Sequence, residues 1–239
     1  MKLYAVGIGP GSIEYLAERA KQVIVESEVV VGYTAYVELI DELIKGKEVI
    51  STGMKSEVER CRKALDEAKK GKKVVVVSSG DAGIYGMAAL LYEMKERSVD
   101  VEVVPGITAA TAAASILGSP LSNDFAVISL SDLLTPWQVI EKRLEAVSAG
   151  DFVVCLYNPQ SKKRDDYLQK ACQIALKHKP LETYCGYVRN AFRCDQEYKI
   201  CTLQELSSTN VDMFTIVIIG NSATKVIDGK LVTTRGYKI

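Results

Sequence analysis

The strongest constraint on the fold is a run of four valines, Val74–Val77, that leads directly into Ser78, Ser79 and Gly80. A continuous β-branched run followed by a glycine turn is typical of a strand buried on both faces, as in a parallel α/β sheet. Three more short apolar runs in the first half of the chain have the same character: Leu3–Ile8, Val29–Val31 and Val101–Val104. The first half is therefore predicted to form a mainly parallel sheet.

Apolar residues at intervals of three and four predict helices between and after these strands. The sets are Val58, Cys61, Leu65 and Ala68; Met87, Leu90, Leu91 and Met94; Trp137, Ile140, Leu144 and Val147; and Leu168, Cys172, Ala175 and Leu176. Ser56 with Glu59 predicts a capping box at the first of these helices. Thr135 is expected to cap the third helix, with Pro136 as its first helical residue.

The pattern changes at the turn-rich stretch Gly118–Asp124, which is the expected domain boundary. Beyond it the predicted strands are Phe125–Ile128, Phe152–Leu156, Tyr184–Val188, Glu197–Cys201 and Phe214–Ile219. Several of these are too close in sequence for crossover helices, so this half is predicted to form a mixed sheet. We expect two α/β lobes, residues 1–118 and 119–239, with a ligand cleft between them.

Composition excludes several classes of function. Lys and Arg together number 30, as do Asp and Glu, so the chain lacks the basic excess typical of nucleic-acid-binding proteins. No signal-peptide core and no run of ~18 apolar residues occurs, so we expect a cytoplasmic protein without a membrane partner. Six cysteines without two-residue spacing, and the single histidine His178, predict reduced thiols and no protein-bound metal.

Two glycine-rich turns follow predicted strands. Gly7–Gly11 does not match a dinucleotide-binding fingerprint, because Ser12 stands where the third glycine belongs and Pro10 has no N–H for a pyrophosphate. A tight strand-to-helix turn is the structural alternative for this stretch. In Ser78–Gly86, Asp81 either caps the next helix or accepts hydrogen bonds from a ligand at the carboxyl end of the strand.

Three motifs occur in order: G-x-G-P-G at 7–11, S-G-D-A-G-I-Y-G at 79–86 and P-G-I-T-A at 105–109. Together they resemble the tetrapyrrole methylase family, and the resemblance covers essentially the whole chain. Four further segments are similar to the precorrin-3B or cobalt-precorrin-3B C(17)-methyltransferases within it: Gly32–Tyr36, Gly53–Lys55, Ile128–Trp137 and Leu156–Pro159. One departure is Ala17, where many relatives carry a helix-capping threonine.

The resemblance implies methylation of precorrin-3B, or its cobalt form, at C-17 in cobalamin biosynthesis, with ring contraction to the corresponding precorrin-4. It implies S-adenosylmethionine as methyl donor, a small-molecule tetrapyrrole substrate that brings any cobalt with it, and a homodimer. The implied donor-binding residues are Pro10, Ser79, Gly80, Asp81, Ile84, Thr108, Ala109, Tyr157, Ala191 and Gly220. Many relatives carry glycine at the position of Ala191.

The macrocycle is expected over the first glycine loop, and its acetate and propionate groups call for basic partners. The expected substrate-binding residues are Gly7, Gly9, Gly11, Lys55, Ser129 and Arg164. Other basic candidates are Arg60, Lys162, Lys163, Arg189 and Arg193, for each of which a solvated surface charge is the alternative.

Ser131 and Asp132 are the candidate catalytic residues, because the loop that holds them follows a predicted strand and groups hydroxyls with a carboxylate. We expect them to assist ring contraction; the alternative is that Asp132 only organises the turn. Two other functions stay open at this point. One is methylation of another macrocycle position or of an rRNA nucleotide, and the other is non-catalytic corrinoid binding.

Overall fold

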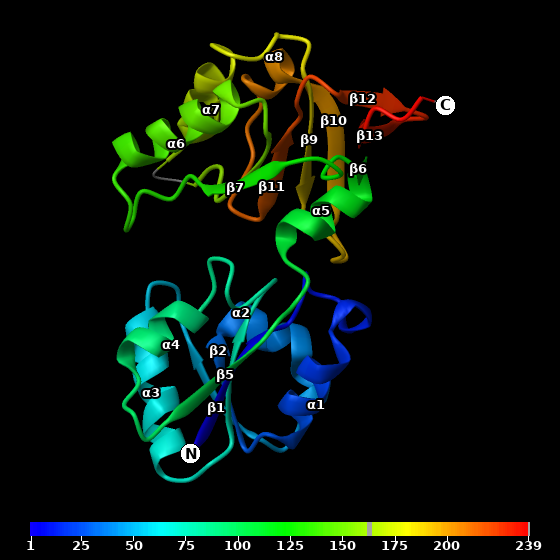
Figure 1. Ribbon diagram of the computed structural model, residues 1–239. Helices are drawn as coiled ribbons and strands as arrows, with labels where there is room; N and C mark the ends of the chain where they lie inside the picture. The colour runs from blue at the N-terminus through cyan, green and yellow to red at the C-terminus, as the bar shows by residue number, and fades with distance from the viewer. Residues whose placement is uncertain (162–163, 239) are drawn as a thin grey trace. The chain divides into compact units, whose positions relative to one another are not determined.

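The computed structural model describes residues 1–161 and 164–238 and divides into two compact units, Met1–Ala109 and Ala110–Ile239 (Figure 1). The units meet within the first turn of α5 (Ala109–Leu117), upstream of the expected boundary at residue 118. The reason is that α5 packs on the second unit, where Leu117 fills the space above Gly186. Each unit has its own sheet and its own core.

The first unit is built on a five-stranded sheet in which all strands are parallel. Its strands, in the order β3-β2-β4-β1-β5, are β3 (Glu48–Thr52), β2 (Val29–Tyr33), β4 (Val74–Ser78), β1 (Lys2–Gly7) and β5 (Asp100–Val104). The four-valine run pairs with β1 on one side and β2 on the other, which confirms its prediction as an inner strand. β3 was not predicted, because this edge strand is partly exposed and lacks a continuous apolar run.

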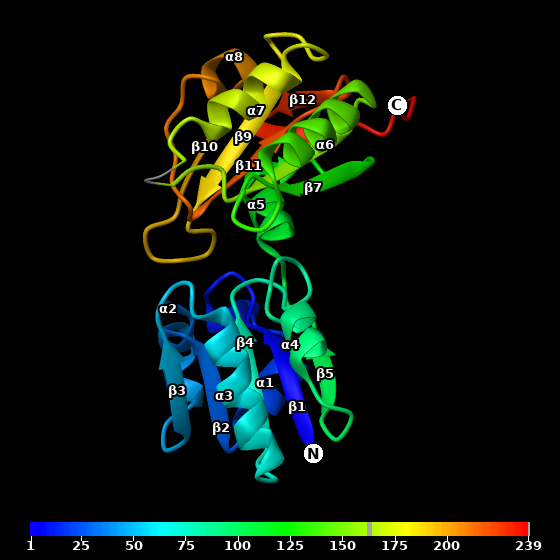
Figure 2. The same ribbon diagram turned by 90° about the vertical axis from the view of Figure 1, so that its left-hand side faces the viewer.

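Helices cover both faces of this sheet (Figures 1 and 2). One face carries α1 (Glu18–Glu26), α2 (Thr34–Val37) and the 3-10 helix η2 (Glu38–Leu43); the other carries α3 (Glu57–Lys69) and α4 (Ala88–Met94). A short 3-10 turn, η1 (Ile13–Tyr15), precedes α1. Val75 and Val77 of β4 pack toward α1, and Val74 and Val76 pack toward α3. Burial of alternate residues on opposite faces explains why the strand is valine throughout.

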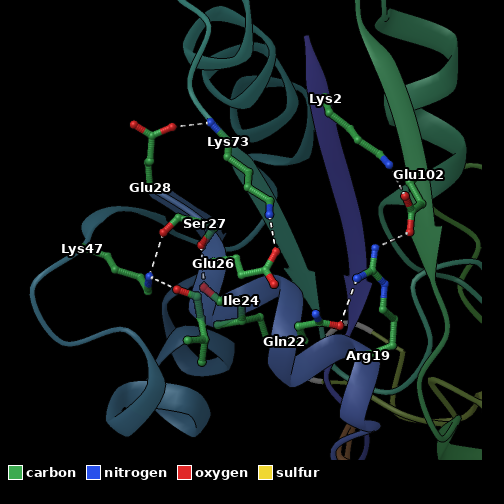
Figure 3. Close-up of polar contacts among 11 residues, drawn as sticks. Lys2, Arg19, Gln22, Ile24, Glu26, Ser27, Glu28, Lys47, Lys73 and Glu102 are labelled. Atoms are coloured by element: carbon green, nitrogen blue, oxygen red, sulfur yellow. Dashed lines mark hydrogen bonds and ion pairs between the residues drawn. The ribbon is translucent and has the colours of Figure 1, made fainter.

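Charged side chains around α1 and the amino-terminal ends of the strands are paired (Figure 3). Lys2 Nζ lies 2.6 Å from Glu102, which also accepts from Arg19 at 3.2 Å. Lys73 forms an ion pair with Glu26. The hydrogen bond from Lys73 lowers the pKa of Glu26, and the bond from Lys2 lowers that of Glu102. Several charges on this side of the first unit are therefore paired with neighbouring side chains, whereas Lys47 donates to the backbone carbonyls of Val25 and Ser27.

The second unit contains the predicted mixed sheet. Its strands, in the order β10-β9-β11-β8-β7, are β10 (Glu197–Thr202), β9 (Tyr184–Arg189), β11 (Thr215–Ile219), β8 (Val153–Tyr157) and β7 (Phe125–Ser129). Only β7 and β8 pair in parallel, and the other neighbours are antiparallel. A core cluster lies between this sheet and α6 (Trp137–Ala149), α7 (Tyr167–Ala175) and α8 (Leu203–Leu206). A small sheet of β12 (Thr224–Ile227), β13 (Lys230–Thr233) and β6 (Gly118–Ser119) completes the unit.

Two predicted helix caps are wrong. Ser56 is the N-cap residue of α3, but its side chain makes no capping bond, and the carboxylate of Glu59 pairs with Lys63 at 2.7 Å instead. α6 begins at Trp137, so Pro136 rather than Thr135 is its N-cap residue. A complete capping box occurs instead at α8, between Thr202 and Glu205. Within the described ranges, no helix is long and apolar enough to cross a membrane.

The capping box gives a first prediction. Replacing Thr202 by Ala removes the acceptor of the Glu205 N–H, and we expect a loss of about 1 kcal/mol in the free energy of unfolding. Ser56→Ala is the matched control, since Ser56 occupies an N-cap position without a capping bond and should change the stability by less than about 0.5 kcal/mol. Urea unfolding followed by circular dichroism measures both values. Equal losses in the two variants would contradict the assignment.

Candidate active site

In the first unit, the carboxyl-terminal ends of β4, β1 and β5 lie side by side at one end of the parallel sheet. β1 and β4 are neighbours, and the chain leaves them toward opposite faces, to α1 and α4. Such a switch point is where open α/β sheets usually place a ligand site. Here the two departing loops are joined, because Gly9 N–H donates to the Gly80 carbonyl at 3.0 Å and Gly80 N–H donates to the Gly9 carbonyl at 2.7 Å.

The glycines at this edge are required by the close approach of the backbones. A Cβ on Gly7 would lie 2.7 Å from the Gly80 carbonyl oxygen, and one on Gly106 would lie 2.3 Å from the same atom. Gly9 and Gly80 have φ values of 71° and 70°, which favour glycine. Backbone packing thus accounts for Gly7 and Gly106 without a ligand, and contact of Gly7, Gly9 or Gly11 with a substrate stays a prediction.

Asp81 connects the loops after β4 and β5. Its Oδ1 accepts from the N–H groups of Gly83 at 2.7 Å and Ile84 at 3.1 Å, and its Oδ2 accepts from Gly106 N–H at 2.9 Å. The alternative that Asp81 caps α4 is wrong, because that helix begins only at Ala88. Three of the roughly four acceptor positions of a carboxylate are occupied by the protein. Asp81 therefore positions the loops, and one acceptor position is left for a ligand.

The remaining first-unit candidates surround this junction. Pro10 is buried in the first loop, Ser79 and Thr108 are half-buried in the loops after β4 and β5, and Ala109 is half-buried at the start of α5. Ile84 and Tyr85 are exposed by 40% and 57%, and Tyr85 adopts a φ of 53°. Lys55 follows β3 with a φ of 65° and is exposed. The strand-end edge thus presents apolar side chains beside closely packed backbone.

In the second unit, the parallel strands β7 and β8 end side by side, with Ser129 opposite Tyr157. Asn158, which follows β8 in a left-handed conformation with φ 51°, donates from Nδ2 to Ser129 Oγ at 2.9 Å. Ser131 N–H donates to the same oxygen at 3.2 Å. The Tyr157 hydroxyl accepts from Ala110 N–H at 2.9 Å, at the start of α5. These bonds fix the loop that holds the candidate catalytic residues.

Asp132 lies in a small polar cluster beside that loop. Tyr167 donates from its hydroxyl to Asp132 Oδ2 at 2.6 Å, and Arg164 Nη1 lies 3.7 Å from Asp132 Oδ1. The hydrogen bond to Asp132 raises the pKa of Tyr167. Tyr167 packs against Trp137, with ring centroids 4.4 Å apart. The sequence analysis named Asp132 and Arg164 but missed Tyr167, for which no sequence spacing gave a signal, and it included Asn158 only as part of the segment Leu156–Pro159, without a role.

Other predicted site residues of the second unit do not join this cluster. Ala191 follows β9, at the same end of the sheet as Tyr157, whereas Gly220 follows the antiparallel β11 at the other end. Gly220 is packed there against the Tyr184 carbonyl, 2.5 Å from where its Cβ would lie. Arg189 is paired with Asp212 and Asp195. Arg193 is half-buried in the loop after β9, and Lys162 and Lys163 lie outside the described residues.

The buried cysteines are poor nucleophiles in this arrangement. All six are free, and all except Cys194 are buried. Burial raises the pKa of Cys155 and Cys172 to about 12 and that of Cys61 to about 11, so these thiols stay protonated at neutral pH. In the part of the chain that the structure describes, no three His, Cys, Asp or Glu side chains are grouped to hold a metal ion.

Comparison with known proteins identifies the family. The family model of the tetrapyrrole (corrin/porphyrin) methylases matches residues 2–207. The chain belongs to the tetrapyrrole methylase family. It is 46% identical to the probable cobalt-factor III C(17)-methyltransferase of Salmonella typhimurium, over 99% of this chain and 100% of the relative. It is 34% identical to the precorrin-3B C(17)-methyltransferase of a Sinorhizobium species, over 95% and 91% of the two chains.

Solved structures of methylases agree with this assignment. The crystal structure of the methyltransferase CobJ has a TM-score of 0.91 and 33% identity, covering 97% of this chain and 99% of that one. Some relatives are longer. The chain spans only 45% of the cobalt-factor III methyltransferase of Priestia megaterium and 53% of the cobalamin biosynthesis protein CbiHC of Archaeoglobus fulgidus.

The glycine junction gives a second prediction. Gly106→Ala places a Cβ against backbone oxygen, so we expect a loss of about 2–3 kcal/mol in the free energy of unfolding. Gly53→Ala is the control, because nothing lies within 4 Å of a Cβ at that position. Thermal and urea unfolding compare the two variants. A Gly106→Ala variant as stable as the Gly53→Ala variant would show that the junction relaxes without cost.

Proposed function

We propose that this chain is an S-adenosylmethionine-dependent methyltransferase that methylates C-17 of cobalt-factor III or precorrin-3B in cobalamin biosynthesis. The observation that carries the proposal is the 46% identity, over the whole length of both chains, to a relative named for this reaction on cobalt-factor III. The relative named for precorrin-3B is less similar, at 34% identity. This difference favours a substrate that already contains cobalt.

The residues at the strand-end junction fit a compact donor. Gly80 is buried, and a Cβ there would come into ordinary van der Waals contact with Ala109 and Thr108, at 3.5 and 3.7 Å, so the absence of a side chain leaves room beside the loop after β5. Ile84 and Ile107, exposed by 40% and 38%, offer apolar surface, and Asp81 keeps one free acceptor position. We propose that Gly80, Asp81 and Ile84, with Ser79, Thr108 and Ala109 beside them, hold the donor, as the family resemblance implies.

Little acid–base chemistry is required of the chain for methyl transfer itself. S-adenosylmethionine, when bound, supplies a methyl group that is already activated as a sulfonium. The protein then binds and orients the two partners, and alignment alone can contribute several kcal/mol to lowering a barrier. The rigid junction of Gly9, Gly80 and Asp81 suits this task, because hydrogen bonds fix each loop to its neighbour.

Ring contraction requires proton movement, and we propose that the loop after β7 provides it. Asp132 is exposed enough to meet a substrate, with 38% of its side chain accessible, while Tyr167 holds one of its oxygens. Ser131 lies beside it on a loop that Ser129 and Asn158 fix. Asp132 would hold or move a proton at Oδ1, and Ser131 would hydrogen-bond the oxygen functions of the substrate.

The decisive experiment is mass spectrometry of the product formed from cobalt-factor III and S-adenosylmethionine. We expect a gain of one methyl group, with transfer of label from the methyl donor, and an absorption spectrum that reports the contracted ring. Precorrin-3B is tested in parallel to decide the role of cobalt. Binding of either macrocycle without label transfer would support a non-catalytic corrinoid-binding protein instead.

The loop after β7, which holds Ser131 and Asp132, gives a separate prediction. Asp132→Asn should retain methyl transfer but slow ring contraction by about 10²–10⁴-fold, the usual contribution of a general acid–base group. Ser131→Ala should also retain methyl transfer and slow contraction, because it removes a hydrogen bond to the substrate. Asp124→Asn is the matched control, because Asp124 is an exposed carboxylate at the opposite end of β7. Methylation is followed by mass and contraction by absorbance. Wild-type rates for both steps in both loop variants would make the loop purely structural.

We also propose a cytoplasmic homodimer. The six free cysteines favour a reducing compartment, and the homodimer follows from the family resemblance. Light scattering of the purified protein measures its mass in solution directly.

A further inference from the structure

One buried charge in the first unit has no partner of opposite sign among the residues that the structure describes. Arg60, on the first turn of α3, is only 4% exposed. Its Nε donates to Thr52 Oγ1 at 2.9 Å, its Nη2 donates to the Gly53 carbonyl at 3.0 Å, and its Nη1 contacts Met87 Sδ at 3.6 Å. Among the described residues, no carboxylate lies within 4.0 Å of this guanidinium.

The other buried charged side chains are compensated. Lys179 pairs with Asp151 at 3.3 Å, and Glu67 pairs with Lys70 and Lys72. A buried ion without a counter-ion costs free energy, because hydrogen bonds to neutral groups replace only part of its hydration. A thioether is a weak acceptor, so Nη1 of Arg60 is the least satisfied part of the group. Among the described residues, two of its five N–H donors have no acceptor.

The surroundings of Arg60 add positive potential. Arg60 lies at the amino-terminal end of the 13-residue helix α3, where the helix dipole is positive and Ser56 supplies no side-chain cap. Lys55, just before the helix, is held in a left-handed conformation. Of the two acidic residues in this turn, Glu59 is engaged by Lys63, and Glu57 is exposed and forms no ion pair with Arg60.

Arg60 also lies at the end of the sheet where the candidate active site is placed. Its hydrogen bonds go to Thr52, the last residue of β3, and to Gly53, so the guanidinium lies at the carboxyl-terminal end of that strand. Because β3, β2 and β4 are consecutive neighbours ~4.8 Å apart, this end is about 10 Å from the end of β4, where Gly80 lies. A macrocycle over the glycine loops can reach that far with a side chain.

We propose that Arg60, with the amino terminus of α3 and Lys55, binds a carboxylate side chain of the tetrapyrrole. This inference rests on the proposed function. The carboxylate displaces the flexible thioether of Met87 and pairs with the free N–H groups of the guanidinium, the geometry that Arg provides and Lys does not. Arg60 is thus a substrate-binding residue that recognises an acidic group on the rim of the macrocycle.

The test measures binding without turnover, with uroporphyrin III as a stable polycarboxylate probe and S-adenosylhomocysteine as the donor-site probe. Arg60→Met should weaken uroporphyrin III binding at least tenfold and leave the affinity for S-adenosylhomocysteine within twofold. Arg62→Met, which removes an exposed guanidinium from the same helix, is the matched control and should change neither affinity. Absorbance titration and calorimetry give the two dissociation constants.

A second variant keeps the proposal testable if Arg60→Met fails to fold. Met87→Glu retains the arginine and places an internal carboxylate beside Nη1. We expect it to occupy the anion site and weaken uroporphyrin III binding at least fivefold. If Arg60 only fixes the turn after β3, the new carboxylate at position 87 would pair with it and the affinity for uroporphyrin III would not change. That result would overturn the proposal.

The outcomes also separate this inference from the proposed function. Wild-type protein that binds uroporphyrin III through Arg60 but does not methylate cobalt-factor III would support the carboxylate site and reject the proposed function. Wild-type protein that methylates cobalt-factor III while a folded Arg60→Met variant binds uroporphyrin III normally would reject the carboxylate site alone. Failure of the wild type to bind uroporphyrin III would also reject it.

Discussion

The architecture of the first unit depends on the contact of three backbones at the ends of β1, β4 and β5. Gly7, Gly80 and Gly106 approach one another so closely that no side chain fits on the first or the third, and Asp81 ties the β4 and β5 loops together. The consequence for function is that these loops form one rigid body. A substitution at Gly9 cannot act on a single loop, because Gly9 exchanges two hydrogen bonds with Gly80.

The sequence predicted those parts of the fold that burial determines. Strands covered on both faces, such as Val74–Val77, are continuous apolar runs, and their pairing followed the expected parallel arrangement. The edge strand Glu48–Thr52 was missed, since a strand with one neighbour and partial exposure needs no such run. The cap at Ser56 was also mispredicted, because Lys63 one turn later takes the carboxylate that the capping box requires.

The candidate site was predictable in its chain segments but not in its contacts. Motifs at strand ends predicted where a ligand would bind, and the loop of Ser129, Ser131 and Asp132 was proposed in this way. Which groups hold that loop could not be found, because Tyr167 approaches Asp132 from a helix 35 positions further along the chain. For Asp81 the sequence predicted a possible ligand contact. In the structure its carboxylate accepts three hydrogen bonds from backbone N–H groups of its own unit.

Net charge and local charge lead to different conclusions about the ligand. A formal charge of zero argues against a nucleic acid, yet a tetrapyrrole with several carboxylates is also a polyanion. The two differ in size: a long polyanion needs an extended basic surface, whereas a compact one needs a few uncompensated cations in a defined place. Around α1 several charges have a partner of opposite sign, as Lys2 and Arg19 have in Glu102. Arg60 instead keeps its charge uncompensated at the strand ends, so a neutral chain can still select a small acidic ligand at that position.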